Sequence, residues 1–150
     1  MNKKQIILNF LQTQHHMIIA TVNGQGKPEA AFVGFAESDD LSLIFGTSTA
    51  SRKYRNIQID NYVAIVFGSE KGITVQYEGT ASSLIGEELL AYKKMYFTKM
   101  PSSQKYENNK DQNYLKITPN WLGYTDYAKE EIEIFDYLPT PATATTESSS

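Results

Sequence analysis

The chain contains no cysteine, and its two histidines are the adjacent pair His15 and His16. The absence of cysteine excludes disulfides, thiolate nucleophiles and zinc or iron–sulfur sites built on cysteine. Neighbouring residues of a strand point to opposite faces, so the histidine pair could hardly bind one metal ion. No stretch approaches the roughly 20 apolar residues that cross a bilayer, and the N-terminus shows no secretory signal pattern. We therefore expect a cytoplasmic protein without a metal site or membrane contact.

Arginine is scarce as well, because only Arg52 and Arg55 are arginines among the 14 basic residues. The formal net charge is −3, but it is unevenly distributed along the chain. Residues 126–150 carry six acids and one lysine, whereas residues 1–125 have a net charge of +2. Such a mild balance provides no extended basic surface, so nucleic acid is a poor candidate partner.

The length of 150 residues and the 41% hydrophobic content are typical of one globular domain. The last twelve residues, 139–150, contain no large apolar side chain and are rich in threonine, serine and proline. This composition predicts a domain over residues 1–138 and a disordered tail over 139–150.

Alternating and short apolar runs predict about seven strands, near residues 17–22, 29–35, 41–45, 62–67, 73–82, 114–126 and 131–137. The continuous apolar run 62–67 is typical of a strand buried on both faces. Helical spacing occurs over 3–14, 51–59 and 87–97, without regular βαβ alternation. We therefore expect a mainly β fold, an antiparallel β-barrel with peripheral helices. Residues 101–113 contain one large hydrophobe and are interpreted as a mobile loop or a functional cover.

The most informative segment is residues 45–53, where a strand ends, hydroxyl residues turn the chain and two cations begin a helix. A helix start offers free backbone N–H groups and the positive end of the helix dipole. Thr47, Ser51, Arg52 and Lys53 would add donors and positive charge to it. Cations in a first turn are unfavourable unless an anion lies between them, so the segment indicates either a phosphate site or a solvated, capped helix start.

The order of these elements resembles the pyridoxamine 5'-phosphate oxidase-like flavoproteins, the FMN-binding split barrels, including their general-stress-protein-like members. The resemblance rests on Thr47-x3-Ser51-Arg52-Lys53 before a helix, on the strand Val75-Gln-Tyr-Glu-Gly79-Thr80-Ala81 and on the late segment 116–126. It covers residues 5–137. It implies a homodimer that binds FMN in a groove between its subunits.

The resemblance also implies roles for individual residues. The FMN phosphate would be held by Thr47, Ser51, Arg52 and Lys53, in agreement with the helix start described above. The remaining implied contacts lie along the flavin ring: backbone at Ala31, Phe32 and Val33, the pyrimidine edge at Thr74 and Val75, and Trp121 near the partner's flavin. Trp121 is equally compatible with a plug in the core or the dimer interface.

Two departures separate the chain from the vitamin B6 oxidases of that family. Those enzymes bind the substrate phosphate with late arginines and histidines, whereas this sequence has no arginine after Arg55 and no histidine after His16. Gly46 also replaces an aromatic residue that is common there.

The sequence therefore predicts an FMN-dependent oxidoreductase that acts on a small organic substrate or NAD(P)H, with no catalytic side chain required because the flavin carries the chemistry. Three alternatives stay open: a non-catalytic flavin-binding or stress-response protein, a split barrel that uses F420 or haem, and, as an outsider, a β-barrel that binds nucleic acid.

Overall fold

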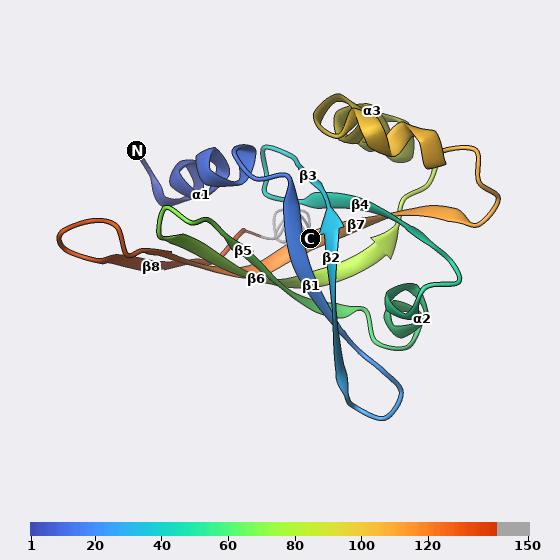
Figure 1. Cartoon of the computed structure of the whole chain (residues 1–150), viewed down its shortest axis with the longest axis horizontal. Helices are drawn as coiled ribbons and strands as arrows, with labels where there is room; N and C mark the ends of the chain where they lie inside the picture. The colour runs from blue at the N-terminus through green and yellow to red at the C-terminus, as the bar shows by residue number, and fades with distance from the viewer. Residues whose placement is uncertain (141–150) are drawn as a thin grey trace, which may run out of the picture.

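The computed structural model describes residues 1–140 and contains one eight-stranded sheet with peripheral helices (Figure 1). The helices are α1 (Lys3–Gln12), α2 (Arg52–Ile59), α3 (Gly86–Lys99) and the 3₁₀ helix η1 (Pro101–Tyr106). The strands are β1 (His16–Val22), β2 (Pro28–Gly34), β3 (Ala36–Glu37), β4 (Leu43–Ser48), β5 (Tyr62–Gly68), β6 (Ile73–Ser83), β7 (Gln112–Asp126) and β8 (Glu133–Tyr137). None of these helices combines the length and apolarity needed to cross a bilayer.

The sheet is antiparallel throughout and curls strongly. Its strand order is β2-β1-β5-β6-β7-β4-β3, and β8 pairs with the far half of β7. The two ends of this order, β2 and β3, are separated in the chain only by Phe35, whose amide donates to the carbonyl of His15 at 3.3 Å. The ends of the sheet therefore approach each other. The predicted mainly β, antiparallel barrel with peripheral helices is confirmed.

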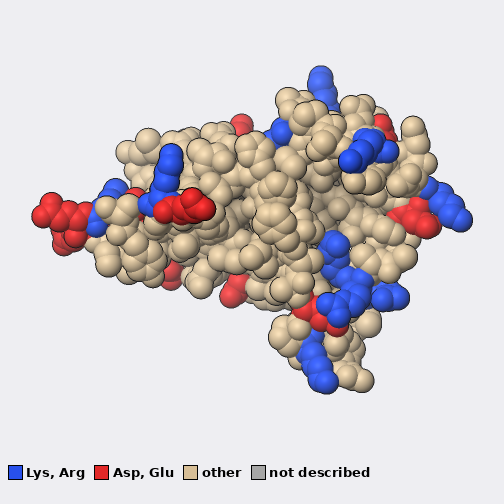
Figure 2. All heavy atoms as spheres, viewed as in Figure 1, with Lys and Arg blue, Asp and Glu red and all other residues tan. Residues whose placement is uncertain are grey.

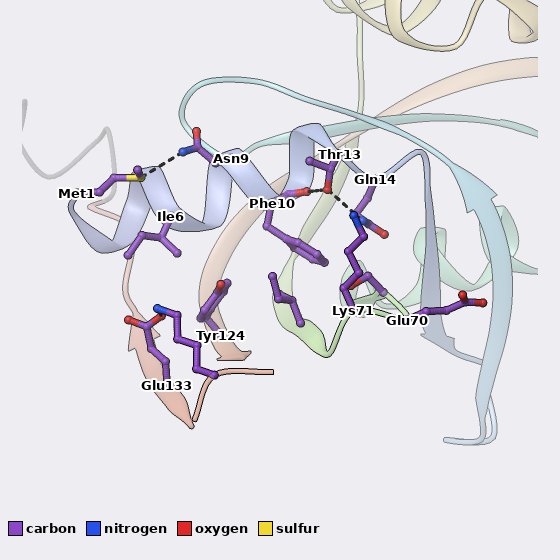
Figure 3. Close-up of a pocket in the computed structure, with 13 residues that line it drawn as sticks. Met1, Ile6, Asn9, Phe10, Thr13, Gln14, Glu70, Lys71, Tyr124 and Glu133 are labelled. Atoms are coloured by element: carbon purple, nitrogen blue, oxygen red, sulfur yellow. Dashed lines mark hydrogen bonds and ion pairs between the residues drawn. The ribbon is translucent and has the colours of Figure 1, made fainter. Parts of the chain in front are cut away.

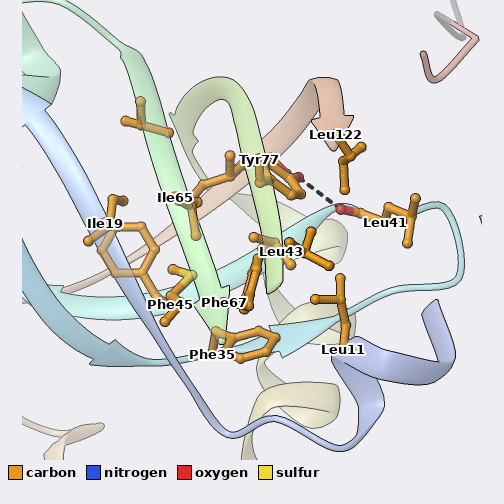
Figure 4. Packing of buried hydrophobic residues seen from close by; sticks show 14 of the residues in the cluster. Leu11, Ile19, Phe35, Leu41, Leu43, Phe45, Ile65, Phe67, Tyr77 and Leu122 are labelled. Atoms are coloured by element: carbon orange, nitrogen blue, oxygen red, sulfur yellow. Dashed lines mark hydrogen bonds between the residues drawn. The ribbon is translucent and has the colours of Figure 1, made fainter. Parts of the chain in front are cut away.

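The core lies inside the curl and is built from the inward-facing residues of the strands (Figure 4). Phe35, Phe45 and Phe67 are fully enclosed there, and α1 closes the core with Ile7 and Leu11. A second apolar cluster joins α3 to β4 and β7.

Tyr77 places one polar group in this core. Its hydroxyl donates to the carbonyl of Leu41 at 2.8 Å and lies 3.2 Å from the carbonyl of Ile117. Figure 4 shows this bond crossing the interior. The hydroxyl therefore fixes the 38–42 turn to the sheet.

Gly79 marks an irregularity in the pairing of β6 with β7, where the register shifts between Glu78 and Gly79. A Cβ atom at this position would lie 2.4 Å from the carbonyl oxygen of Thr118. Because that atom belongs to the backbone, only glycine fits. The bulge increases the local bend of the sheet.

The prediction that residues 62–67 are buried on both faces is wrong. Burial alternates along β5, with Val63, Ile65 and Phe67 enclosed and Tyr62 and Val66 exposed. The reason is that helices cover the rim of the barrel and leave the outer surface of β5 bare within one chain (Figure 1).

The segment 101–113, interpreted as a mobile loop or a cover, begins with η1, which packs against α3. The predicted tail at 139–150 lies, from residue 141 onward, outside the described residues.

Candidate functional site

The start of α2 brings together hydroxyl groups from two elements. Ser51 caps the helix, because its hydroxyl accepts a hydrogen bond from the amide of Tyr54 at 3.2 Å. Thr47, at the end of β4, lies 2.9 Å from the same hydroxyl through its own Oγ1. The end of the strand and the beginning of the helix are therefore joined by a pair of hydroxyl groups, of which one O–H stays free to donate to an anion.

Lys53 is the unusual cation at this helix start. It is half-buried, and this burial lowers the pKa of its ammonium group. Among residues 1–140, no carboxylate forms an ion pair with it. A desolvated positive charge without a partner is unfavourable, so the position gains stability when an anion binds.

Arg52 and Lys53 line a small pocket of about 130 Å³ together with Thr21, Glu29, Ala30 and Ala31. Among the sequence-predicted residues, the structure thus unites Ala31, Arg52 and Lys53, with Thr47 and Ser51 beside them at the start of α2. We call this pocket and the start of α2 the cradle. In Figure 2 basic side chains gather over α2, with acidic atoms beside them toward the β1–β2 hairpin.

Sequence reasoning missed three polar residues of the cradle. Asn56, buried on α2, donates to Glu29 Oε1 at 2.8 Å and to the buried hydroxyl of Thr21 at 3.0 Å. Glu29 Oε2 in turn lies 3.3 Å from the guanidinium of Arg52. The available signal was that Asn56 follows Arg52 by one helical turn and that an acid lies two residues before the predicted ring-binding segment of β2.

The predicted ring-binding segment of β2 presents alternating faces. The side chains of Ala31 and Val33 turn inward, whereas Phe32 points outward, is 70% exposed and stacks on His16 with ring centroids 4.7 Å apart. The three side chains therefore cannot all face one ligand, and a shared contact would have to use the backbone, as the resemblance implies.

The outward face continues from Phe32 across the sheet. One cross-strand row runs through β2, β1, β5, β6 and β7 as Phe32, Ile18, Val66, Gln76 and Gly123. We call this row, with Trp121 beside it, the outer row. Its first three members are substantially exposed hydrophobic side chains.

Trp121 belongs to this outward face and does not plug the core. Its indole lies over Gly123, where a Cβ atom would be 2.7 Å from Cη2. Thr74 also points outward, whereas the side chain of Val75 is fully enclosed in the core. Val75 can therefore contact a ligand only through its backbone.

The structure leaves no space for a side chain at Gly46. A Cβ atom there would lie 2.6 Å from Nε2 of Gln112 and 3.2 Å from the ring of Tyr114. Two neighbours on β7 thus occupy the position where the vitamin B6 oxidases commonly have an aromatic side chain.

A larger pocket than the cradle, of about 700 Å³, lies elsewhere (Figure 3). It is bounded by Ile6 and Phe10 of α1, by Tyr124 of β7 and by the turn between β5 and β6. It shares no lining residue with the cradle. Its two cations, Lys71 and Lys129, stand among two carboxylates, Glu70 and Glu133, and Lys129 is paired with Glu133 at 2.8 Å, so this pocket is less suited to a phosphate.

The model of the family described as pyridoxamine 5'-phosphate oxidase matches residues 4–126. The chain belongs to this family. No curated protein matches the sequence.

Solved structures share the fold of this family member. General stress protein 26 from Bacillus anthracis superposes with a TM-score of 0.69 at 24% identity, covering 83% of this chain and 94% of that one. A haem-binding protein from Mycobacterium smegmatis gives 0.79 at 15% identity, and ChuZ from Campylobacter jejuni gives 0.76 at 14%. Each of these two covers 93% of this chain, which spans only 59% and 63% of their respective lengths.

Proposed function

We propose that this family member binds FMN and acts as an FMN-dependent oxidoreductase on a small organic substrate, with NAD(P)H or a reduced substrate as electron donor. The observation that carries the proposal is Lys53, a half-buried cation without an ion-pair partner in the described chain. It faces a pocket at the start of a helix and stands beside Arg52. This arrangement fits a phosphate group.

The dimensions of the cradle support a phosphate at this position. The pocket of about 130 Å³ exceeds several-fold the space of roughly 10–15 Å³ that a single water molecule requires, so it can admit a group larger than water, such as a phosphate. Arg52 and Lys53 would supply charge, and Thr47 and Ser51 would supply hydroxyl donors. The flavin ring would extend past β2 to the outward face.

The outward face supports a homodimer. Apolar residues on a sheet face that no helix covers favour a partner, and a two-fold dimer places the same row on both sides of its interface. We propose that a second copy covers the outer row and that FMN lies at its edge, near Thr74 and the partner's Trp121.

FMN bound there would supply the redox chemistry, since flavins exchange hydride or electrons with a substrate. The protein would bind and orient it: the cradle holds the phosphate, the β2 backbone supports the ring, and Thr74 offers a hydrogen bond to the ring edge. The vitamin B6 reaction itself is disfavoured, because residues 56–150 contain no arginine and residues 17–150 no histidine for a second phosphate.

The test is retention of FMN by a double variant, Arg52→Ala with Lys53→Ala. We expect the purified chain to be yellow and to release FMN on denaturation, and the double variant to lose the flavin while its circular dichroism and melting temperature stay close to wild type. The matched control is Lys3→Ala with Lys4→Ala, which removes two cations from the first turn of α1. Equal FMN affinity in wild type and in the cradle variant would refute the assignment.

Haem is the second candidate, and one observation favours it. His16 is exposed on the outward face and stacks on Phe32, so its imidazole could serve as an axial ligand at the proposed interface. Titration with hemin and with FMN separates the two: a Soret band that is lost in His16→Ala would support haem, whereas FMN uptake that persists in that variant supports flavin.

A flavin-binding protein without turnover is distinguished by activity. Steady-state oxidation of NAD(P)H by the FMN-loaded protein supports the oxidoreductase, whereas stoichiometric binding without turnover on a broad substrate panel supports a storage or stress-response role.

A further inference from the structure

The cradle contains an anion of its own. Glu29 extends from β2 into the pocket, and its Oε2 lies 3.3 Å from the guanidinium of Arg52. The side chain of Glu29 is 19% exposed, whereas that of Arg52 is 66% exposed. The carboxylate is therefore the better-anchored member of this pair, and the arginine reaches over to it from solvent.

Amide groups hold the carboxylate in place and keep it charged. Asn56 donates to Oε1 at 2.8 Å, and Asn23 donates to Oε2 at 3.4 Å. The hydrogen bond from Asn56, together with that from Asn23 and the positive charge of Arg52, lowers the pKa of Glu29 below its usual value despite its partial burial. Glu29 is thus ionised at neutral pH and cannot easily turn away.

A phosphate that enters the cradle meets this carboxylate. The phosphate group needs Arg52, which Glu29 already engages, and two anions in one small pocket repel each other. Lys53 makes no ion pair in the described chain, so the pocket offers one unengaged cation and one that must be taken from a competitor.

We propose that Glu29 is an internal competitor for the cofactor phosphate, which weakens FMN binding and makes the flavin exchangeable. When the flavin leaves, the carboxylate recovers Arg52 and compensates the charge of the cradle. This inference rests on the proposed function. It assigns Glu29 the opposite role from that of the surrounding polar residues, since removing its charge should strengthen binding.

The main test is Glu29→Gln, whose amide oxygen can still accept the hydrogen bond from Asn56. Exposed ion pairs contribute up to about 1 kcal/mol, and loss of repulsion adds to this, so we expect FMN to bind roughly five-fold more tightly. The dissociation rate of FMN should fall, whereas the affinity for riboflavin, which lacks the phosphate, should stay unchanged. Fluorescence titration and stopped-flow mixing measure these quantities.

Two controls separate this effect from charge in general. Glu133→Gln makes the same change in net charge at an ion pair that shares no contact with the cradle, and it should leave FMN affinity unchanged. In an Arg52→Ala background, Glu29→Gln should give less than half of its effect, because the contested guanidinium is gone.

FMN binding by Glu29→Gln that is equal to or weaker than wild type would overturn the proposal and make Glu29 a positioning residue. If neither protein binds FMN, the proposed function fails, and inorganic phosphate then decides the inference. Stronger thermal stabilisation of Glu29→Gln than of wild type by phosphate, at ionic strength matched with chloride, supports it. Equal stabilisation, or none in either protein, overturns it.

Discussion

Phe32 allows the proposed dimer to be tested quantitatively. Its side chain is 70% exposed although it stacks on His16. An aromatic side chain buries 150–250 Å² when enclosed, so about 100–170 Å² remains available for a partner. At about 25 cal/mol per Å², this area corresponds to about 3–4 kcal/mol for each copy. A two-fold interface contains the residue twice.

We therefore expect Phe32→Ala to weaken the dimer strongly. Buried area does not convert fully into affinity, so we take less than half of the value summed over the two copies of Phe32, about 3 kcal/mol. This loss corresponds to roughly a 100-fold increase in the dimer dissociation constant. Sedimentation equilibrium over a range of protein concentrations measures this constant. The melting temperature of the monomer should change little, because Phe32 lies outside the core.

Leu90 provides a matched control. It is 67% exposed, nearly as much as Phe32, but it lies on α3, away from the outer row. Leu90→Ala should leave the dissociation constant unchanged. Equal dissociation constants for wild type, Phe32→Ala and Leu90→Ala, or a wild type that stays monomeric at high micromolar concentration, would refute the reasoning.

Three further predictions concern stability. Gly79→Ala should destabilise the fold by more than about 2 kcal/mol in urea denaturation, because its Cβ would meet a backbone carbonyl of β7, and an unchanged denaturation midpoint would contradict this. Tyr77→Phe should lower the free energy of unfolding by about 1–3 kcal/mol in the same assay, because it leaves the enclosed carbonyl of Leu41 without its donor. A decrease of less than about 0.5 kcal/mol would show that the bond is dispensable. The pKa of Glu29 is lowered, chiefly by the hydrogen bond from Asn56. The ionised carboxylate therefore stabilises the fold above the usual glutamate pKa, and this stabilisation is lost as the pH falls through the lowered value. Acid titration of Glu29→Gln should show a shallower loss of folding stability than that of wild type.

Much of the barrel could be predicted from the sequence because its strands carry the period-two pattern of a half-buried sheet. β6 is the clearest case, with Val75 and Tyr77 enclosed and their neighbours turned outward. The same rule failed at β5, where small and apolar residues such as Ala64 and Val66 occupy the outward positions. When apolar residues occupy both faces of a strand, the sequence shows no alternation, so periodicity could not reveal that the outer face of β5 is exposed to solvent.

The cradle shows the same division between local and long-range information. Thr47, Ser51, Arg52 and Lys53 are close in sequence, and the chemistry of a helix start predicted their grouping. Glu29 reaches Arg52 only because β2 lies beside β1 and α2 packs against β1, a contact that depends on the tertiary fold. Its competing charge was therefore invisible in the sequence.

Trp121 is the only tryptophan of the chain. Its indole lies beside the backbone of Gly123 on the outer surface of the sheet, and the side chain is only partly buried. Indole emission depends on the polarity of its surroundings, and a flavin nearby absorbs that emission. Trp121 fluorescence can therefore report on the two proposals without any label. Dissociation of the proposed dimer on dilution and binding of added FMN should each change its emission.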